Sequence, residues 1–143
     1  NKRGTIDGGI VTDFSGRKNW FDKIAAKPGE YVSIKAILKN VGFSKLTNVI
    51  CKAEFDEGLS LRCGSTVIFD SHNSKGKAID DIIDISGYNT GDKEAGALTQ
   101  VLYQIRVSND NAFCGTSLNN TFLLDYNGKT QKRLFVTIDV SEQ

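Results

Sequence analysis

The chain has 143 residues, of which 39% are hydrophobic and 24% charged, with 18 basic residues against 17 acidic ones. These are the values of a folded globular domain, and they do not indicate disorder. A net charge near zero argues against a nucleic-acid-binding module, which carries a concentrated basic face. The length predicts one domain that buries about 68–70% of the surface of its unfolded chain.

Fourteen glycines and one proline indicate many tight turns. The sequence contains no methionine, so we expect a domain excised or processed from a larger protein. No apolar run approaches the roughly 18 residues that a membrane span requires, and we expect no membrane insertion in this segment. Residues 1–9 are polar and contain glycine, which predicts a frayed lead-in to the domain.

The first half of the chain shows apolar residues at alternate positions. Residues 9–14 predict a first short strand, and residues 31–39 a longer one with Val32, Ile34, Ala36 and Leu38 on one face. Residues 48–55 alternate in the same way, which predicts that Cys51 points inward. Leu59 and Leu61 continue this pattern after a turn, and residues 66–69 start another strand.

The second half begins with two long loops. Residues 70–77 form a polar loop, and residues 87–96 form a second loop rich in glycine and charge. Residues 98–107 then predict a central strand. Asn127-Gly128 is a strong signal for a type I′ hairpin turn between strands at residues 122–126 and 132–138.

Helical periodicity of any length is missing from the sequence. About eight or nine short strands with regular turn signals instead predict an all-β sandwich of two antiparallel sheets.

The ordered turn motifs of this chain resemble those of a known family. They are Lys27-Pro28-Gly29-Glu30, Asn40-Val41-Gly42, Leu46-Thr47-Asn48-Val49, Gly58-Leu59 and Gly64-Ser65-Thr66. In order and spacing they are similar to the repeated extracellular domain of bacterial surface proteins known as domain of unknown function eleven. The resemblance implies an immunoglobulin-like sandwich that spaces or displays the other domains of the same protein. It also implies an extracellular location, at the bacterial cell surface or cell wall.

Three aspartates, Asp80, Asp81 and Asp84, are the weak candidates for a metal site, because calcium prefers several carboxylate and carbonyl oxygens. The segment has neither the glycine nor the spacing of a calcium loop. A solvated strand edge, charged against edge-to-edge pairing, is the better interpretation. We therefore predict no metal and no cofactor.

Catalysis is not indicated either. A cysteine or serine nucleophile needs a base, and the only histidine, His72, lies in a polar loop where solvent exposure is expected.

Two kinds of covalent cross-link, a disulfide and an isopeptide bond, could stabilise such a sandwich. Cys51, Cys63 and Cys114 contain no CxxC spacing, so three reduced thiols or one disulfide with a free thiol both fit the sequence. Cys63–Cys114 and Cys51–Cys63 are the candidate pairs, and a bond would stabilise the fold by about 2–4 kcal/mol. An internal Lys–Asn isopeptide bond is disfavoured. Asn120 has inward parity, but the lysines at positions 35 and 39 fall on the opposite face of their strand.

Tyr88 and Trp20 are the candidate ligand-binding aromatics, although both also fit packing at the rim of the core. The sequence thus predicts a non-enzymatic spacer module of a bacterial cell-surface or secreted protein. The alternative is an adhesin-like module. It would use the loops at residues 70–77 and 87–96 to bind a carbohydrate or protein ligand of the host or environment.

Overall fold

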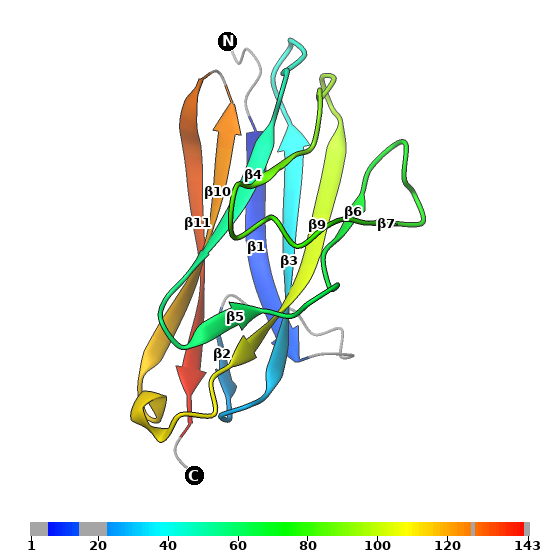
Figure 1. The fold of residues 1–143 in the computed structure, drawn as a ribbon. Helices are drawn as coiled ribbons and strands as arrows, with labels where there is room; N and C mark the ends of the chain where they lie inside the picture. The colour runs from blue at the N-terminus through cyan, green and yellow to red at the C-terminus, as the bar shows by residue number, and fades with distance from the viewer. Residues whose placement is uncertain (1–5, 15–22, 127, 142–143) are drawn as a thin grey trace.

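The structure is a computed structural model that describes residues 6–14, 23–126 and 128–141. Figure 1 shows two layers of strands packed against each other in an elongated sandwich. In the described residues the helical content is one short 3-10 turn, η1 (Asn111–Phe113). The predicted all-β class is therefore confirmed.

The first sheet follows the order β1-β3-β9-β6-β7, and β5 also pairs with β9. Its strands are β1 (Ile6–Phe14), β3 (Tyr31–Asn40), β5 (Leu59–Leu61), β6 (Val67–Phe69), β7 (Lys77–Ala78) and β9 (Leu98–Val107). All of its pairings are antiparallel. β1 starts at Ile6, inside the predicted lead-in, because its backbone pairs with β3 from Ile6↔Asn40 to Phe14↔Val32.

The second sheet has the order β2-β11-β10-β4-β8. Its strands are β2 (Lys23–Ala26), β4 (Ile50–Phe55), β8 (Tyr88–Asn89), β10 (Ser117–Tyr126) and β11 (Lys129–Val140). β2 pairs with β11 in parallel, from Lys23↔Thr137 to Ala26↔Val140. The structure differs from the predicted antiparallel sheets in this one pairing. β2 has four residues, and β7 and β8 have two each, too few to show a period in the sequence.

The core lies between the two sheets and follows the predicted alternation. On β3, Val32, Ile34, Ala36 and Leu38 are at most 2% exposed, and Cys51 on β4 is fully buried. The inward residues of β9, β10 and β11 complete the core: Val101, Tyr103, Ile105, Val107, Leu118, Phe122, Leu124, Val136, Ile138 and Val140. Each large apolar side chain buried in this way stabilises the fold by about 1.5–3 kcal/mol.

The predicted hairpin joins β10 and β11. Tyr126 pairs with Lys129, so the connection has the expected two-residue length at positions 127 and 128. Gly128 has a φ of +80°, a left-handed conformation that type I′ turns require and glycine adopts without strain. Asn127 itself lies outside the described residues.

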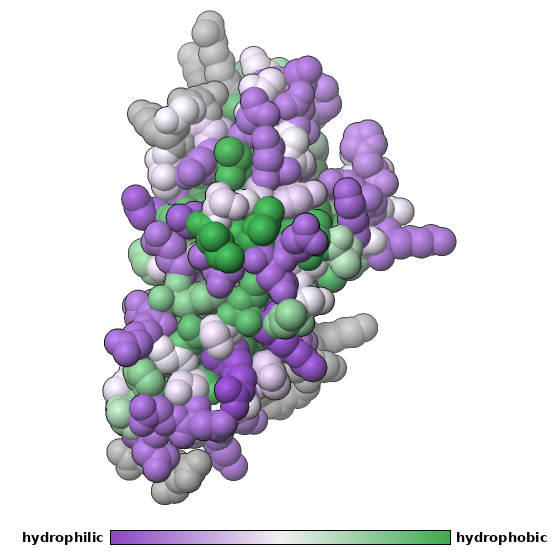
Figure 2. Space-filling model, in the orientation of Figure 1, coloured by the Kyte–Doolittle hydropathy of each residue, from purple (hydrophilic) through white to green (hydrophobic). Residues whose placement is uncertain are grey.

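Most of the surface seen in Figure 2 is hydrophilic, with one gathering of apolar side chains near the middle of that face. It lies over β4 and the segment between β7 and β8, which includes Ile85, 68% exposed. None of the helical structure in the described residues is long and apolar enough to cross a membrane.

Candidate functional site

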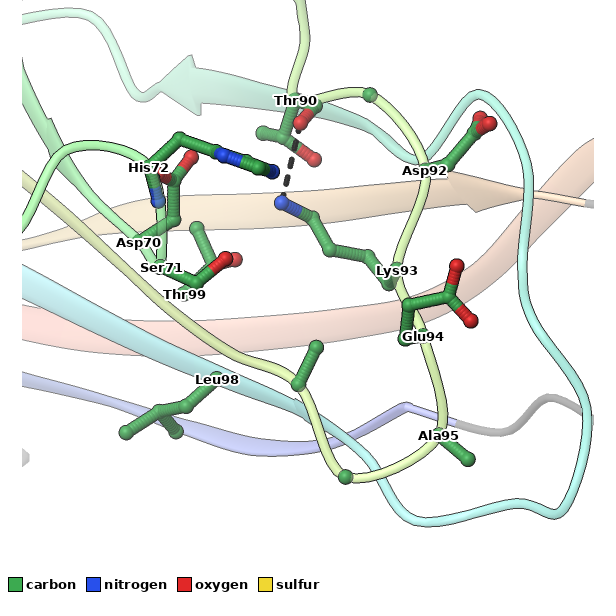
Figure 3. A pocket seen from close by; sticks show the side chains of 13 residues that line it. Asp70, Ser71, His72, Thr90, Asp92, Lys93, Glu94, Ala95, Leu98 and Thr99 are labelled. Atoms are coloured by element: carbon green, nitrogen blue, oxygen red, sulfur yellow. Dashed lines mark hydrogen bonds between the residues drawn. The ribbon is translucent and has the colours of Figure 1, made fainter.

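The two loops that the sequence favours for ligand binding line one cleft of about 720 Å³ (Figure 3). Asp70, Ser71 and His72 come from the loop after β6, and residues 90–97 come from the loop between β8 and β9. Leu98 and Thr99, at the start of β9, complete the lining. A volume of this size is in the range of small-ligand sites.

The second loop is held in place by Asn40 and Leu46. The Lys93 backbone exchanges two hydrogen bonds with Leu46, of 2.7 and 2.9 Å. The buried Asn40 side chain donates from Nδ2 to the carbonyl oxygens of Lys93 and Ser44, both at 2.9 Å. Its Oδ1 accepts from the Gly42 N–H at 3.0 Å. The Asn40 turn therefore fixes one wall of the cleft.

Lys93 is the central charged group of the cleft, and its residue is only 5% exposed. Its side chain extends toward His72 and donates from Nζ to the Thr90 carbonyl at 3.0 Å (Figure 3). Burial lowers the pKa of this amine, and the nearby Asp70 carboxylate offsets part of that effect. The lysine is thus a hydrogen-bond donor held in place, and not a freely moving surface charge.

Asp70 shapes the opposite wall. Its Oδ1 accepts from the backbone N–H groups of His72 and Asn73, both at 2.9 Å, and from the Asn73 side chain at 3.0 Å. Burial raises the pKa of Asp70, but these hydrogen bonds and the Lys93 charge outweigh it, so that the pKa is lowered. Asp70 is therefore a carboxylate at neutral pH.

Thr99 contributes an unusual group to the cleft. It is 1% exposed, and its Oγ1 has no hydrogen-bond partner within the described part of the chain. A buried hydroxyl is normally paired, because leaving it unpaired costs about 1–3 kcal/mol. Thr99 thus brings to the lining a buried hydroxyl whose hydrogen-bonding capacity is unmet in the described residues.

The sequence-predicted aromatic candidates lie elsewhere. Tyr88 is on β8, where its backbone pairs with Cys51 and its half-buried side chain packs against the core. It does not line the cleft. Trp20 lies outside the described residues. His72 is exposed in its loop, as predicted.

The three aspartates do not converge on one point. Both carboxylate oxygens of Asp81 accept from the Gly64 N–H, at 3.0 Å, while Asp80 and Asp84 are exposed. Among the described residues, no group of three or more His, Cys, Asp or Glu side chains is placed to hold a metal ion.

Asn120 points inward, as its parity predicted, and is fully buried. Its Oδ1 accepts from the Tyr103 hydroxyl at 3.0 Å. Lys39 is exposed and Lys35 lies on the same outward face of β3, so the structure does not bring either lysine to this amide.

The three cysteines, all within the described ranges, are free, so neither candidate disulfide is formed. Cys51 points into the core from β4, Cys63 lies in an exposed turn, and Cys114 follows η1. Burial raises the pKa of the Cys51 thiol to about 12. A hydrogen bond to Asp81, together with its charge, raises the pKa of Cys63. Neither of these two thiols is an activated nucleophile.

Thiol labelling checks this arrangement. In the native protein we expect iodoacetamide to modify Cys63 and Cys114 and to leave Cys51 unmodified until the protein is unfolded, as measured by mass spectrometry of peptides. Asp81→Asn is expected to speed the modification of Cys63, because the thiol loses the partner that keeps it protonated. Asp80→Asn, at the exposed neighbour, is the matched control. Rapid native labelling of Cys51 would contradict its place in the core.

The two loops were predicted from the sequence, but Asn40, Lys93 and Thr99 were not predicted as residues of the site. A lysine in a glycine-rich loop carries no periodic signal. Thr99 does carry one, since it is a polar residue at an inward position of β9. A polar side chain on a core face is a recognisable sign of a site or of a buried network.

Comparisons with known proteins agree with this architecture. No protein-family model and no curated protein sequence matches the chain. Among solved structures, the chain is similar to BcpA, the major pilin subunit of Bacillus cereus, with a TM-score of 0.58 and 12% identity over 96% of this chain and 40% of that one. It is also similar to RrgB, the pilus backbone of Streptococcus pneumoniae, with a TM-score of 0.55 and 16% identity over 87% of this chain and 33% of that one.

A third similar structure is ACE19, the collagen binding subdomain of the Enterococcus faecalis surface protein ACE. The TM-score is 0.50 and the identity 15%, over 92% of this chain and 95% of that one. A family 123 glycoside hydrolase from Clostridium perfringens and AvmM, which catalyses a macrocyclization, are similar as well. At these identities the likeness defines the fold, an immunoglobulin-like β-sandwich, and does not by itself define an activity. The chain spans only 33–40% of the pilin chains.

Proposed function

We propose that this chain is a non-enzymatic module of a bacterial cell-surface or secreted protein, in which it spaces or displays other domains. The observation that carries the proposal is the path of the chain. β1 begins at one end of the long axis of the sandwich, and β11 ends at the opposite end (Figure 1). A module entered and left at opposite ends adds its full length to a chain of such modules.

Three further observations support this role. Similar folds occur in pilus backbone proteins and in a surface-protein subdomain. The turn motifs resemble the repeated extracellular domain of bacterial surface proteins, and this supports the other domains of the same protein as its partners. The raised pKa values of Cys51 and Cys63 also disfavour a thiol nucleophile.

A spacer must resist tension applied at its ends, and the parallel pairing of β2 with β11 suits that load. Ala26 pairs with Val140 at the end of β11, and the Ala26 carbonyl accepts from the Ser141 N–H at 2.9 Å. Tension that pulls β11 lengthwise loads these hydrogen bonds in shear, so several must break together.

Ala26→Pro is therefore expected to lower the unfolding force in single-molecule stretching through the two ends. In parallel pairing the Ala26 N–H points to the same side as its carbonyl, toward β11, and proline removes that donor. Ala25→Pro is the matched control, because its N–H points away from β11 and edge strands tolerate proline there. Equal unfolding forces for Ala26→Pro and Ala25→Pro would contradict a load-bearing role of this pairing.

The proposed location of this chain at the cell surface is tested by brief trypsin treatment of intact source cells. We expect peptides of this chain in the released fraction. Their release only after lysis would overturn the surface assignment.

A further inference from the structure

We propose that the cleft between residues 70–72 and 90–99 binds a neutral saccharide. This inference goes beyond the spacer role and does not depend on it, since a spacer needs no ligand. It rests on the hydrogen-bonding groups of the cleft, on its charge and on the hollow that continues from it.

The cleft offers both hydrogen-bond donors and hydrogen-bond acceptors. An ammonium has three donors, and the structure shows one donation from Lys93, to the Thr90 carbonyl. The buried Thr99 hydroxyl has no partner in the described residues. Within the described residues, the hydrogen bonds to the Asp70 carboxylate all end on Oδ1, which leaves Oδ2 as an acceptor. A sugar hydroxyl both accepts and donates, so adjacent hydroxyls match Lys93, Thr99 and Asp70 together.

The charge of the cleft disfavours an ionic ligand. Asp70, Asp92 and Glu94 line it together with Lys93, so carboxylates outnumber lysines by two in the lining. Lys45, outside the lining, lies 4.0 Å from the Asp92 carboxylate and offsets part of its charge. An anion would be repelled by this excess, whereas a cation would face the Lys93 ammonium at the centre of the cleft. A neutral polar molecule avoids both penalties.

The cleft also continues into a second hollow that is lined by both apolar and polar side chains. This hollow of about 310 Å³ shares Asp70 and Leu98 with the cleft and is lined in addition by Phe69, Ser74 and Gln100. Leu98 is 48% exposed, and Phe69 is partly exposed. The C–H face of a pyranose ring can pack on such apolar and aromatic surfaces while its hydroxyls remain in the polar cleft. The two hollows together fit more than one sugar ring.

The test is a titration of the ¹⁵N-labelled chain followed by amide chemical shifts. The probes are glucose, galactose, maltose and lactose, with glucuronic acid and glucosamine as charged counterparts, each up to about 50 mM to reach weak binding. We expect at least one neutral probe to shift the amides of residues 70–72 and 90–99, and the disaccharides to bind more tightly than their monosaccharides. The proposal is overturned if none of the four neutral probes shifts any amide, or if the shifts are confined to other regions. Tighter binding of a charged counterpart would overturn it as well.

Two variants test the groups involved. Lys93→Met, which removes the ammonium, and Thr99→Val, which removes one hydroxyl, are each expected to weaken binding about tenfold. Lys27→Met, at an exposed lysine in the turn between β2 and β3, should leave binding unchanged. Thr99→Val keeps the shape of the residue and removes a hydroxyl that has no partner, so it should fold at least as stably as the wild type. Unchanged affinity in this well-folded variant would refute the role of Thr99 and with it the proposed site.

Discussion

Phe122→Ala is expected to lower the free energy of unfolding by about 3–5 kcal/mol, the largest effect we predict for this chain. Phe122 lies on β10 in the second sheet and is fully buried. Its ring stacks with that of Tyr103 on β9 in the first sheet, with 6.4 Å between the ring centroids. The substitution therefore opens a cavity between the sheets, where the surrounding strands are too well paired to collapse into it. Equilibrium unfolding in urea measures the loss.

Phe135→Ala is the matched control for this experiment. Phe135 lies on the neighbouring strand β11, opposite Thr121 of β10, and is 56% exposed. Its truncation removes the same atoms from the outer face of the sheet, so we expect a change within about 0.5 kcal/mol. Similar losses for Phe122→Ala and Phe135→Ala would contradict the position of the core between the two sheets.

The strands of the core could be predicted from the sequence because their signal is local. The alternation on β3 places Val32 and Ile34 inward and also predicts the burial of Cys51 on β4. β2 could not be predicted in this way. It has four residues, and it becomes a strand because β11, from the other end of the sequence, lies beside it. A strand that depends on a distant partner carries little information in its own residues.

The candidate site shows the same division between local and distant contacts. The composition of residues 70–77 and 87–96 predicts two exposed loops, and the structure brings parts of both to one cleft. Which side chains line the cleft depends on contacts between distant residues, such as Asn40 and Lys93, which are 53 positions apart. Tyr88 was a candidate for ligand binding, but it does not line the cleft. It lies in a loop by composition, but two residues of β4 pair with β8 and draw its side chain against the core.

Asn40 is the last residue of β3, and its side chain also holds the Lys93 backbone at the cleft. We expect Asn40→Ala to lower the free energy of unfolding by about 2–3 kcal/mol. The substitution removes the two hydrogen bonds donated to the carbonyls of Ser44 and Lys93 and the one accepted from Gly42. The Lys93 carbonyl and the Gly42 N–H are buried and lose their partner without gaining water, whereas Ser44 is exposed. Urea unfolding measures the change in the free energy of global unfolding. Native-state amide hydrogen exchange measures the change in the free energy of local opening at each amide.

The exchange experiment separates a general loss of stability from a specific loss of cleft geometry. We expect the amides of Leu46 and Lys93, which pair across the cleft wall, to exchange faster in Asn40→Ala than the lower global stability alone accounts for. Asn111→Ala, at an exposed asparagine in η1, is the control and should alter neither measurement. If the Leu46 and Lys93 amides instead follow the global unfolding free energy in Asn40→Ala, Asn40 stabilises the sandwich as a whole. The cleft wall would then be held by the Leu46–Lys93 pairing without it.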